Sequence, residues 1–196
     1  MYTWGYIKDA SLAKLDLEQD EAVNLGLLNR FKFYANEVIT QICSTIKPKH
    51  TFYEVIVDDN NIFKLITMPN DFISFSDDKS TIHYVNECGQ NVIEEIHDNL
   101  MVYKGYNQVC CYKKGTYLIA YNARWFTFDE SVQDDMLLDI PMDILDCIPS
   151  YIASQCYKID DEYKASVYRN EYEIFLSRID DTHFKQNKTF IIEGDW

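Results

Sequence analysis

Apolar residues recur at helical spacing near both ends of this chain, while the stretch between the ends follows a different pattern. Between residues 20 and 46 the apolar positions lie three or four residues apart: Ala22, Leu25, Leu28, Phe31, Ala35, Val38, Ile39, Ile42 and Ile46. This is the spacing of a helix with one buried face. It predicts one long helix over about 19–46, which ends before Pro48 because proline disfavours a helical residue ahead of it.

A second set of apolar residues at helical spacing lies between residues 149 and 179. Its members are Ile152, Cys156, Ile159, Tyr163, Val167, Phe175 and Ile179. We expect them to form the buried side of the closing helices. Pro141 and Pro149 suit first helical turns, so a short helix near 142–147 should precede a longer one from 149. Asp160-Asp161 marks a break before a last helix over 161–180.

Short β-type runs fill the middle of the chain. They lie at 50–57, 62–67, 80–85, 92–96, 100–103, 108–112 and 117–121. The four-residue polar loop Asp58-Asp59-Asn60-Asn61 predicts that the first two runs form a hairpin. Regular short strands with glycine-marked turns are typical of a small sandwich or barrel-like meander.

The fold class predicted from these patterns is α+β. We expect a helical bundle frame, made of the N-terminal long helix and the C-terminal helices, that carries a β-rich sandwich or barrel-like insertion. The helical domain should span 1–47 and 129–182, the insertion 48–128, and a C-terminal docking arm 183–196. A length of 196 residues suits one domain with a large insertion.

The chain is strongly acidic, with 32 acidic and 18 basic residues and a formal charge of -14. We expect no direct binding of DNA or RNA, because no basic stripe is present to neutralise phosphates. The run 129–146 holds seven carboxylates and no Lys or Arg. Such a run is typical of a solvated connection with helix-start charges. No stretch of 18 apolar residues occurs, so we expect no membrane contact.

The sequence shows no constellation of catalytic or metal-binding residues. Its four histidines are scattered, its glycines form no phosphate loop, and its six cysteines include no C-x-x-C pair. We therefore expect no enzyme activity, no metal and no cofactor, with the thiols reduced in a cytosolic compartment. A thiol enzyme that uses Cys110 or Cys111 stays open, because catalytic partners meet only in the fold.

Aromatic residues gather near the two ends of the chain. Trp4 and Tyr6 lie near the first residue, and the last segment reads Thr189-Phe-Ile-Ile-Glu-Gly-Asp-Trp196. Aromatic side chains are favoured at protein interfaces. We expect these ends to dock onto a partner, the tail by adding a strand to the edge of a neighbour's sheet.

Several segments of the sequence resemble phage head–tail connector (adaptor) proteins. The end of that family is similar to Ile140-Pro-Met-Asp-Ile-Leu-Asp-Cys-Ile-Pro-Ser-Tyr-Ile-Ala-Ser-Gln, then Asp160-Asp-Glu-Tyr-Lys-Ala, then Tyr168-Arg-Asn-Glu-Tyr-Glu-Ile-Phe-Leu-Ser-Arg-Ile. Its β-rich insert is similar to Met68-Pro-Asn-Asp-Phe-Ile and Gly115-Thr-Tyr-Leu-Ile-Ala-Tyr-Asn-Ala. The family also shares the order of a helix, a β-rich insert and closing helices.

The resemblance implies a structural virion protein, a ring subunit that docks beneath the portal and joins the capsid to the tail. Such rings are often twelvefold, and they leave a channel through which DNA passes without specific binding. The implied partners are the portal protein, neighbouring copies, and a tail or second ring protein. The implied location is the head–tail junction of the virion, after assembly in the host bacterial cytoplasm.

Two groups of residues have expected roles in such a ring, the first implied by the resemblance and the second by the acidic run at 129–146. The C-terminal arm should bind the portal or a neighbouring subunit through Thr189, Phe190, Ile191, Ile192 and Trp196. Acidic residues should line the channel and repel passing DNA: Asp134, Asp135, Asp139 and Asp143.

A different class of binding protein also fits the charge, namely an acidic DNA-mimic inhibitor of a nucleic-acid enzyme. The net charge favours this alternative. The 18 basic residues spread along the chain argue against it, because a mimic needs ordered carboxylates at phosphate-like spacing.

Overall fold

The computed structural model describes residues 2–76, 82–86, 88–89, 91–92 and 101–179 and confirms the α+β class. The chain divides into two compact units. The helical unit comprises Met1–Lys47 with Phe128–Trp196, and the β unit comprises Pro48–Thr127. The predicted docking arm, 183–196, lies outside the described residues.

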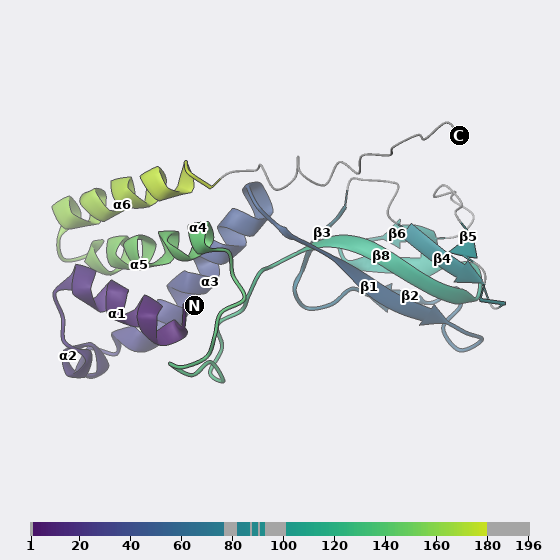
Figure 1. Cartoon of the computed structure of the whole chain (residues 1–196), viewed down its shortest axis with the longest axis horizontal. Helices are drawn as coiled ribbons and strands as arrows, with labels where there is room; N and C mark the ends of the chain where they lie inside the picture. The colour runs from purple at the N-terminus through teal and green to yellow at the C-terminus, as the bar shows by residue number, and fades with distance from the viewer. Residues whose placement is uncertain (1, 77–81, 87, 90, 93–100, 180–196) are drawn as a thin grey trace, which may run out of the picture. The chain divides into compact units, whose positions relative to one another are not determined.

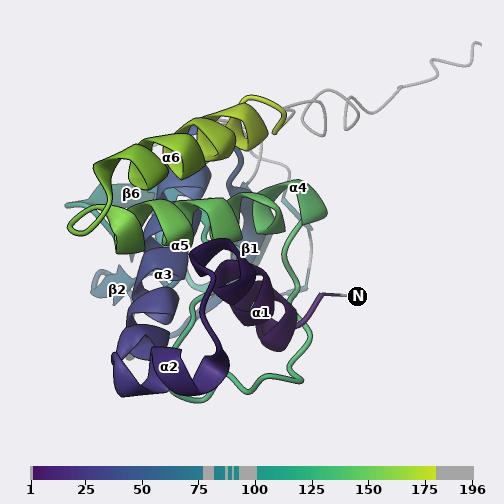
Figure 2. The same ribbon diagram turned by 90° about the vertical axis from the view of Figure 1, so that its left-hand side faces the viewer.

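The helical unit is built around one central helix. Its elements are α1 (Trp4–Leu15), α2 (Gln19–Asn24), α3 (Leu27–Thr45), α4 (Met142–Leu145), α5 (Cys147–Tyr157) and α6 (Glu162–Leu176) (Figure 1). Helix α5 packs against α1, α3 and α6, and Figure 2 shows it between α1 and α6. Every residue of α5 from Cys147 to Ser154 is buried, as expected of a helix that is covered on all sides.

The prediction of one helix over 19–46 is wrong, because the chain breaks between α2 and α3. Gly26 has a φ of 65°, a left-handed conformation that glycine adopts without steric cost. Beyond the break the predicted buried face holds, and Phe31, Ala35, Val38, Ile39 and Ile42 are buried. Leu25, which lies at the break, was expected to be buried and is 61% exposed.

The predicted buried face of the closing helices is wrong for α6. Ile152 in α5 is buried, but Ile159, Tyr163 and Val167 are exposed. Helix α6 instead buries Tyr172, whose ring meets that of Tyr151 edge-on at 5.0 Å. The sequence of α6 carries two apolar rows, and only the row that contains Tyr172 packs on α5.

The β unit consists of two antiparallel sheets (Figure 1). Its strands are β1 (Lys49–Val57), β2 (Leu65–Thr67), β3 (Phe72–Phe75), β4 (Ile82–Asn86), β5 (Asn91–Val92), β6 (Met101–Lys104), β7 (Gln108–Cys111) and β8 (Gly115–Ala123). The larger sheet has the order β1-β8-β4-β5, with β3 also paired to β8, and the smaller has the order β2-β7-β6. Strands β1 and β8 pair along all nine residues of each.

Both sheets contribute to one hydrophobic core. Strand β8 buries every second residue from Tyr117 to Ala123, the alternation of a sheet with one covered face. Val109 and Cys111 from the smaller sheet join the same core. One face of the larger sheet and one face of the smaller sheet therefore pack together in the β unit.

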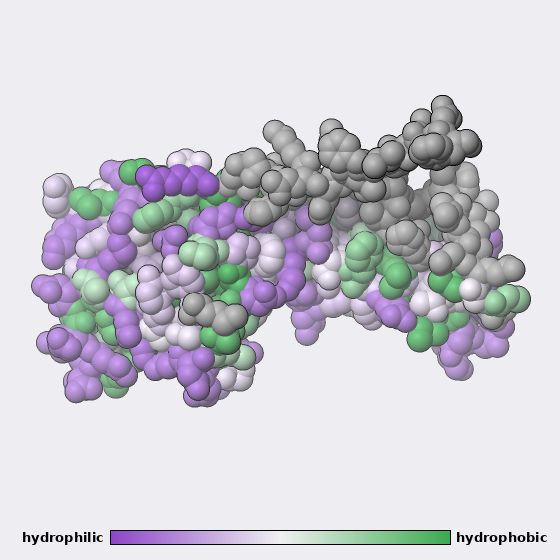
Figure 3. Space-filling view, viewed as in Figure 1, coloured by the Kyte–Doolittle hydropathy of each residue, from purple (hydrophilic) through white to green (hydrophobic). Residues whose placement is uncertain are grey.

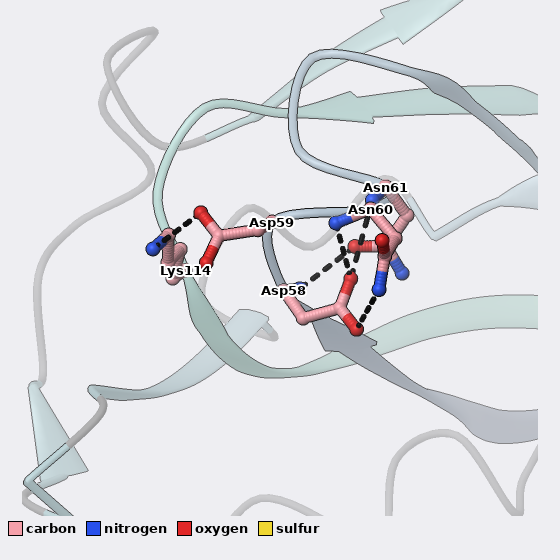
Figure 4. A network of polar contacts seen from close by, with 5 residues as sticks. All are labelled: Asp58, Asp59, Asn60, Asn61 and Lys114. Carbon is pink, nitrogen blue, oxygen red and sulfur yellow. Dashed lines mark hydrogen bonds and ion pairs between the residues drawn. The ribbon is translucent and has the colours of Figure 1, made fainter.

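The predicted hairpin between β1 and β2 is wrong, because β1 pairs with β8 and β2 pairs with β7. The Asp58–Asn61 loop instead passes the chain from one sheet to the other. The Asp58 carboxylate accepts hydrogen bonds from the backbone N–H groups of Asn60 and Asn61, and those from Asn60 lower the pKa of Asp58 most (Figure 4). Asp59 pairs with Lys114 at 2.6 Å. Side chains that form hydrogen bonds with the nearby backbone in this way stabilise a compact loop, here in place of the expected hairpin turn.

Candidate interaction surfaces

The outer face of α6 carries an exposed apolar stripe. Tyr163, Val167 and Ile174 are 79%, 45% and 52% exposed, and their spacing, with Asn170 between the last two, keeps them on one side of the helix. Ile159, in the turn before α6, is 87% exposed. We call Ile159, Tyr163, Val167 and Ile174 the α6 stripe. It lies on the side of α6 opposite to buried Tyr172.

Polar contacts with the end of α1 hold α6 in this orientation. The Lys14 ammonium lies 2.8 Å from the Glu171 carboxylate, and the Tyr168 hydroxyl donates to the Lys14 carbonyl at 2.7 Å. The Tyr157 hydroxyl donates to the Leu15 carbonyl at 2.9 Å, and its ring stacks on that of Tyr168. These contacts attach α6 to α1 and α5 through its inner side, so the stripe faces solvent from a fixed helix.

A second group of exposed apolar residues lies on α2 and on the first two turns of α3. Val23, Leu25 and Phe33 are 55%, 61% and 65% exposed, and we call them the α2–α3 patch. The left-handed turn at Gly26 ends α2 and leaves Leu25 outside the core. Figure 3 shows hydrophobic residues over α6 and, separately, over α2. The stripe and the patch are therefore two of the places where the described part of the helical unit exposes apolar side chains, and Tyr6, Met136, Leu137 and Met142 are exposed as well.

The acidic segment that begins at Asp129 is fastened to the start of α1. The backbone N–H of Gly5 donates to the Asp134 carbonyl at 2.8 Å, and that of Trp4 donates to the Met136 carbonyl at 3.3 Å. A Cβ atom on Gly5 would lie 2.9 Å from the Asp134 carbonyl oxygen, so glycine permits this close approach.

Two of the four predicted channel residues form ion pairs with buried lysines. Asp134 pairs with Lys8, and Asp143 pairs with Lys47 at 2.5 Å. The lysine side chains are 7% and 8% exposed, which makes each pair part of the packing of the helical unit. Asp135 and Asp139 are exposed. The channel-lining role remains a prediction for all four residues.

A pocket of about 460 Å³ lies beside the acidic segment, with Trp4, Lys8, Lys32 and Asp134 among its lining residues. The Lys8 ammonium is paired with Asp134, and the Lys32 ammonium donates to the Asp129 and Val132 carbonyls at 2.8 and 3.0 Å. Both cations therefore already bind protein oxygens, and they fasten the acidic segment to α1 and α3.

Most of the cysteine side chains are shielded from solvent. Cys43, Cys110, Cys111 and Cys147 are buried, whereas Cys88 is exposed. Burial raises the pKa of Cys111 and of Cys147 to about 12, and that of half-buried Cys156 to about 11. Since the thiolate is the reactive form, these three thiols are unreactive near neutral pH. Among the residues that the structure describes, no group of histidine, cysteine and carboxylate side chains is placed to hold a metal ion.

Labelling of the native protein tests the thiol-enzyme alternative. With a thiol reagent at pH 7.5, we expect Cys88 to react and the other five cysteines to react only after denaturant is added. Mass spectrometry of the peptides identifies the labelled residue. Fast native labelling of Cys110 or Cys111 would instead support a reactive thiol.

The sequence patterns located these surfaces only in part. They assigned three residues of the α6 stripe and Leu25 to buried faces, and they did not single out Phe33. A signal is present in α6, because Tyr168, Tyr172 and Leu176 form a second apolar row on the side opposite to Tyr163 and Val167. A helix packed on one side buries only one such row.

Comparison with known proteins leaves the family of this chain open. No protein-family model matches it, and no curated protein matches it at a significant level. In the described part of the chain, no helix has the length and apolar character needed to span a membrane.

Proposed function

We propose that this protein is a structural virion protein, a head–tail connector ring subunit that docks beneath the portal and joins the capsid to the tail. The observation that carries the proposal is the pair of separate apolar surfaces on the helical unit, the α6 stripe and the α2–α3 patch. A subunit of a ring has two neighbouring copies and needs a different surface for each. The segments that resemble connector proteins at 140–155, 160–165 and 168–179 lie in and around α4, α5 and α6.

In this proposal the acidic charge serves the passage of DNA. A channel wall that carries negative charge repels phosphates and keeps the duplex from adhering. Asp135 and Asp139 supply exposed carboxylates. Asp134 and Asp143 have a second role, because their pairs with Lys8 and Lys47 fix the acidic segment on the helices. The same pairing disfavours a DNA mimic, since it breaks up the row of unpaired carboxylates that a mimic would present.

The remaining parts of the proposal concern partners. Thr189, Phe190, Ile191, Ile192 and Trp196 of the C-terminal arm bind the portal or a neighbouring copy. A tail or second ring protein binds the other side of the ring. The protein performs no catalysis, and the burial of Cys110 and Cys111 agrees with that.

Mixing this protein with the portal protein of the same virus tests the proposal. We expect the chain alone to be monomeric at micromolar concentration and to join the portal as a ring of many copies, measured as the mass of the complex. A variant lacking residues 186–196 should bind the portal more weakly with an unchanged melting temperature, because a terminal tail contributes little to a core. Chains that stay monomeric beside an intact portal would contradict the proposal.

A further inference from the structure

The two exposed apolar surfaces of the helical unit differ in charge. Lys164 and Glu171 lie seven residues apart along one flank of the α6 stripe, and Arg178 follows in the turn after α6. The Glu171 carboxylate is neutralised by Lys14 at 2.8 Å, whereas Lys164 and Arg178 are exposed. This flank is therefore basic, although the whole chain has a charge of -14.

The surroundings of the α2–α3 patch have the opposite sign. Glu18, Asp20 and Glu21 precede Val23, and all three are exposed. Between Lys14 and Arg30 the sequence has no basic residue. The patch thus has acidic residues beside Val23, and Arg30 lies one turn before Phe33. The stripe has one basic flank, whereas its opposite flank carries Glu162 and the Arg169–Glu173 ion pair.

We propose that the α6 stripe of one copy packs on the α2–α3 patch of a second copy. The inference rests on the connector function proposed above and names the surfaces that neighbouring subunits use. Apolar side chains meet in the centre of the contact, where Phe33 and Tyr163 provide aromatic anchors of the kind that dominate interfaces. Lys164 and Arg178 face Glu18, Asp20 and Glu21 at its border, which fixes the orientation.

This contact joins two different surfaces of the same unit, so it is heterologous. Each copy that is added presents a fresh stripe on one side and a fresh patch on the other, and such contacts close into rings when the rotation allows. Two copies joined by their α6 stripes would instead form a closed dimer that cannot grow.

Sedimentation velocity of four proteins distinguishes these arrangements. The proteins are the wild type, Val167→Glu in the stripe, Phe33→Glu in the patch, and Leu65→Glu in the β unit as a matched control. Leu65 is 57% exposed, close to the exposures of the two test residues. The measurement extends to about 1 mM, where a contact with a Kd near that value is half populated. Circular dichroism shows whether each variant is folded, and Tyr163→Glu and Leu25→Glu provide second variants.

We expect the wild type and the control to form dimers, trimers and larger species as concentration rises. Each single variant should associate at least about tenfold more weakly than the wild type. An equimolar mixture of Val167→Glu and Phe33→Glu should form dimers and nothing larger, because one intact stripe meets one intact patch. A Phe33→Glu chain that dimerises as well as the wild type, or a wild type that stays monomeric at about 1 mM, would overturn the inference. If that wild type nevertheless forms a ring with the portal, the connector proposal stands and this contact is wrong.

Discussion

Gly115→Ala is expected to destabilise the β unit by ~3–5 kcal/mol, a loss that leaves a unit of this size largely unfolded. Gly115 begins β8 with a φ of 143°, a conformation that residues with a side chain rarely adopt. A Cβ atom there would overlap the Val85 carbonyl oxygen and lie 2.7 Å from a ring carbon of Tyr84. The substitution therefore combines backbone strain with a clash at the junction of β8 and β4.

Hydrogen exchange measured across β1 and β8 tests this expectation, because those strands pair along their full length. Gly105→Ala is the matched control. Gly105 also has a positive φ, 63°, but a Cβ there would meet nothing within 4 Å. The control should cost about 1–2 kcal/mol through strain alone. Equal exchange rates in the two variants would show that the clash at Gly115 is relieved.

Phe31→Ala is expected to cost the helical unit ~3–5 kcal/mol. Phe31 is fully buried in α3, the first of several buried residues that continue through Ile42. Removing its ring leaves a cavity that the surrounding helices fill only in part. Urea unfolding followed by the ellipticity at 222 nm measures the loss.

Phe33→Ala provides the control two residues further along the same helix. Phe33 is 65% exposed, so its removal should change the stability by no more than ~0.5 kcal/mol. It should instead weaken the self-association that involves the α2–α3 patch. A large stability loss for Phe33→Ala, with unchanged association, would show that this ring serves the fold and not a contact.

The pattern of apolar residues was sufficient for the class of fold but not for its pairings. Helical spacing located α3, α5 and α6, and alternation located β1 and β8, because each pattern reflects a local period. The break at Gly26 was missed because a single glycine interrupts the spacing of apolar residues very little. The pairing of β1 with β8 was missed because paired residues such as Tyr53 and Ile119 are 66 positions apart in the sequence. Such residues meet only in the folded protein.

The candidate surfaces were harder to predict than the fold. Periodicity shows that α6 has apolar residues, but two apolar rows compete for one packed side, and contacts of Tyr168 and Tyr172 decide between them. The charge run at 129–146 was evident, yet its pairing with Lys8 and Lys47 depends on residues 126 and 96 positions away. The C-terminal arm stays a prediction, because it lies outside the described residues.

Electron microscopy of this protein mixed with the portal protein proposed as its partner tests the central claim most directly. We expect a closed ring of copies stacked on the portal, with α6 of each subunit against α2 and α3 of the next. Portal particles that look the same with and without the chain, while the chain remains a monomer in solution, would contradict the claim.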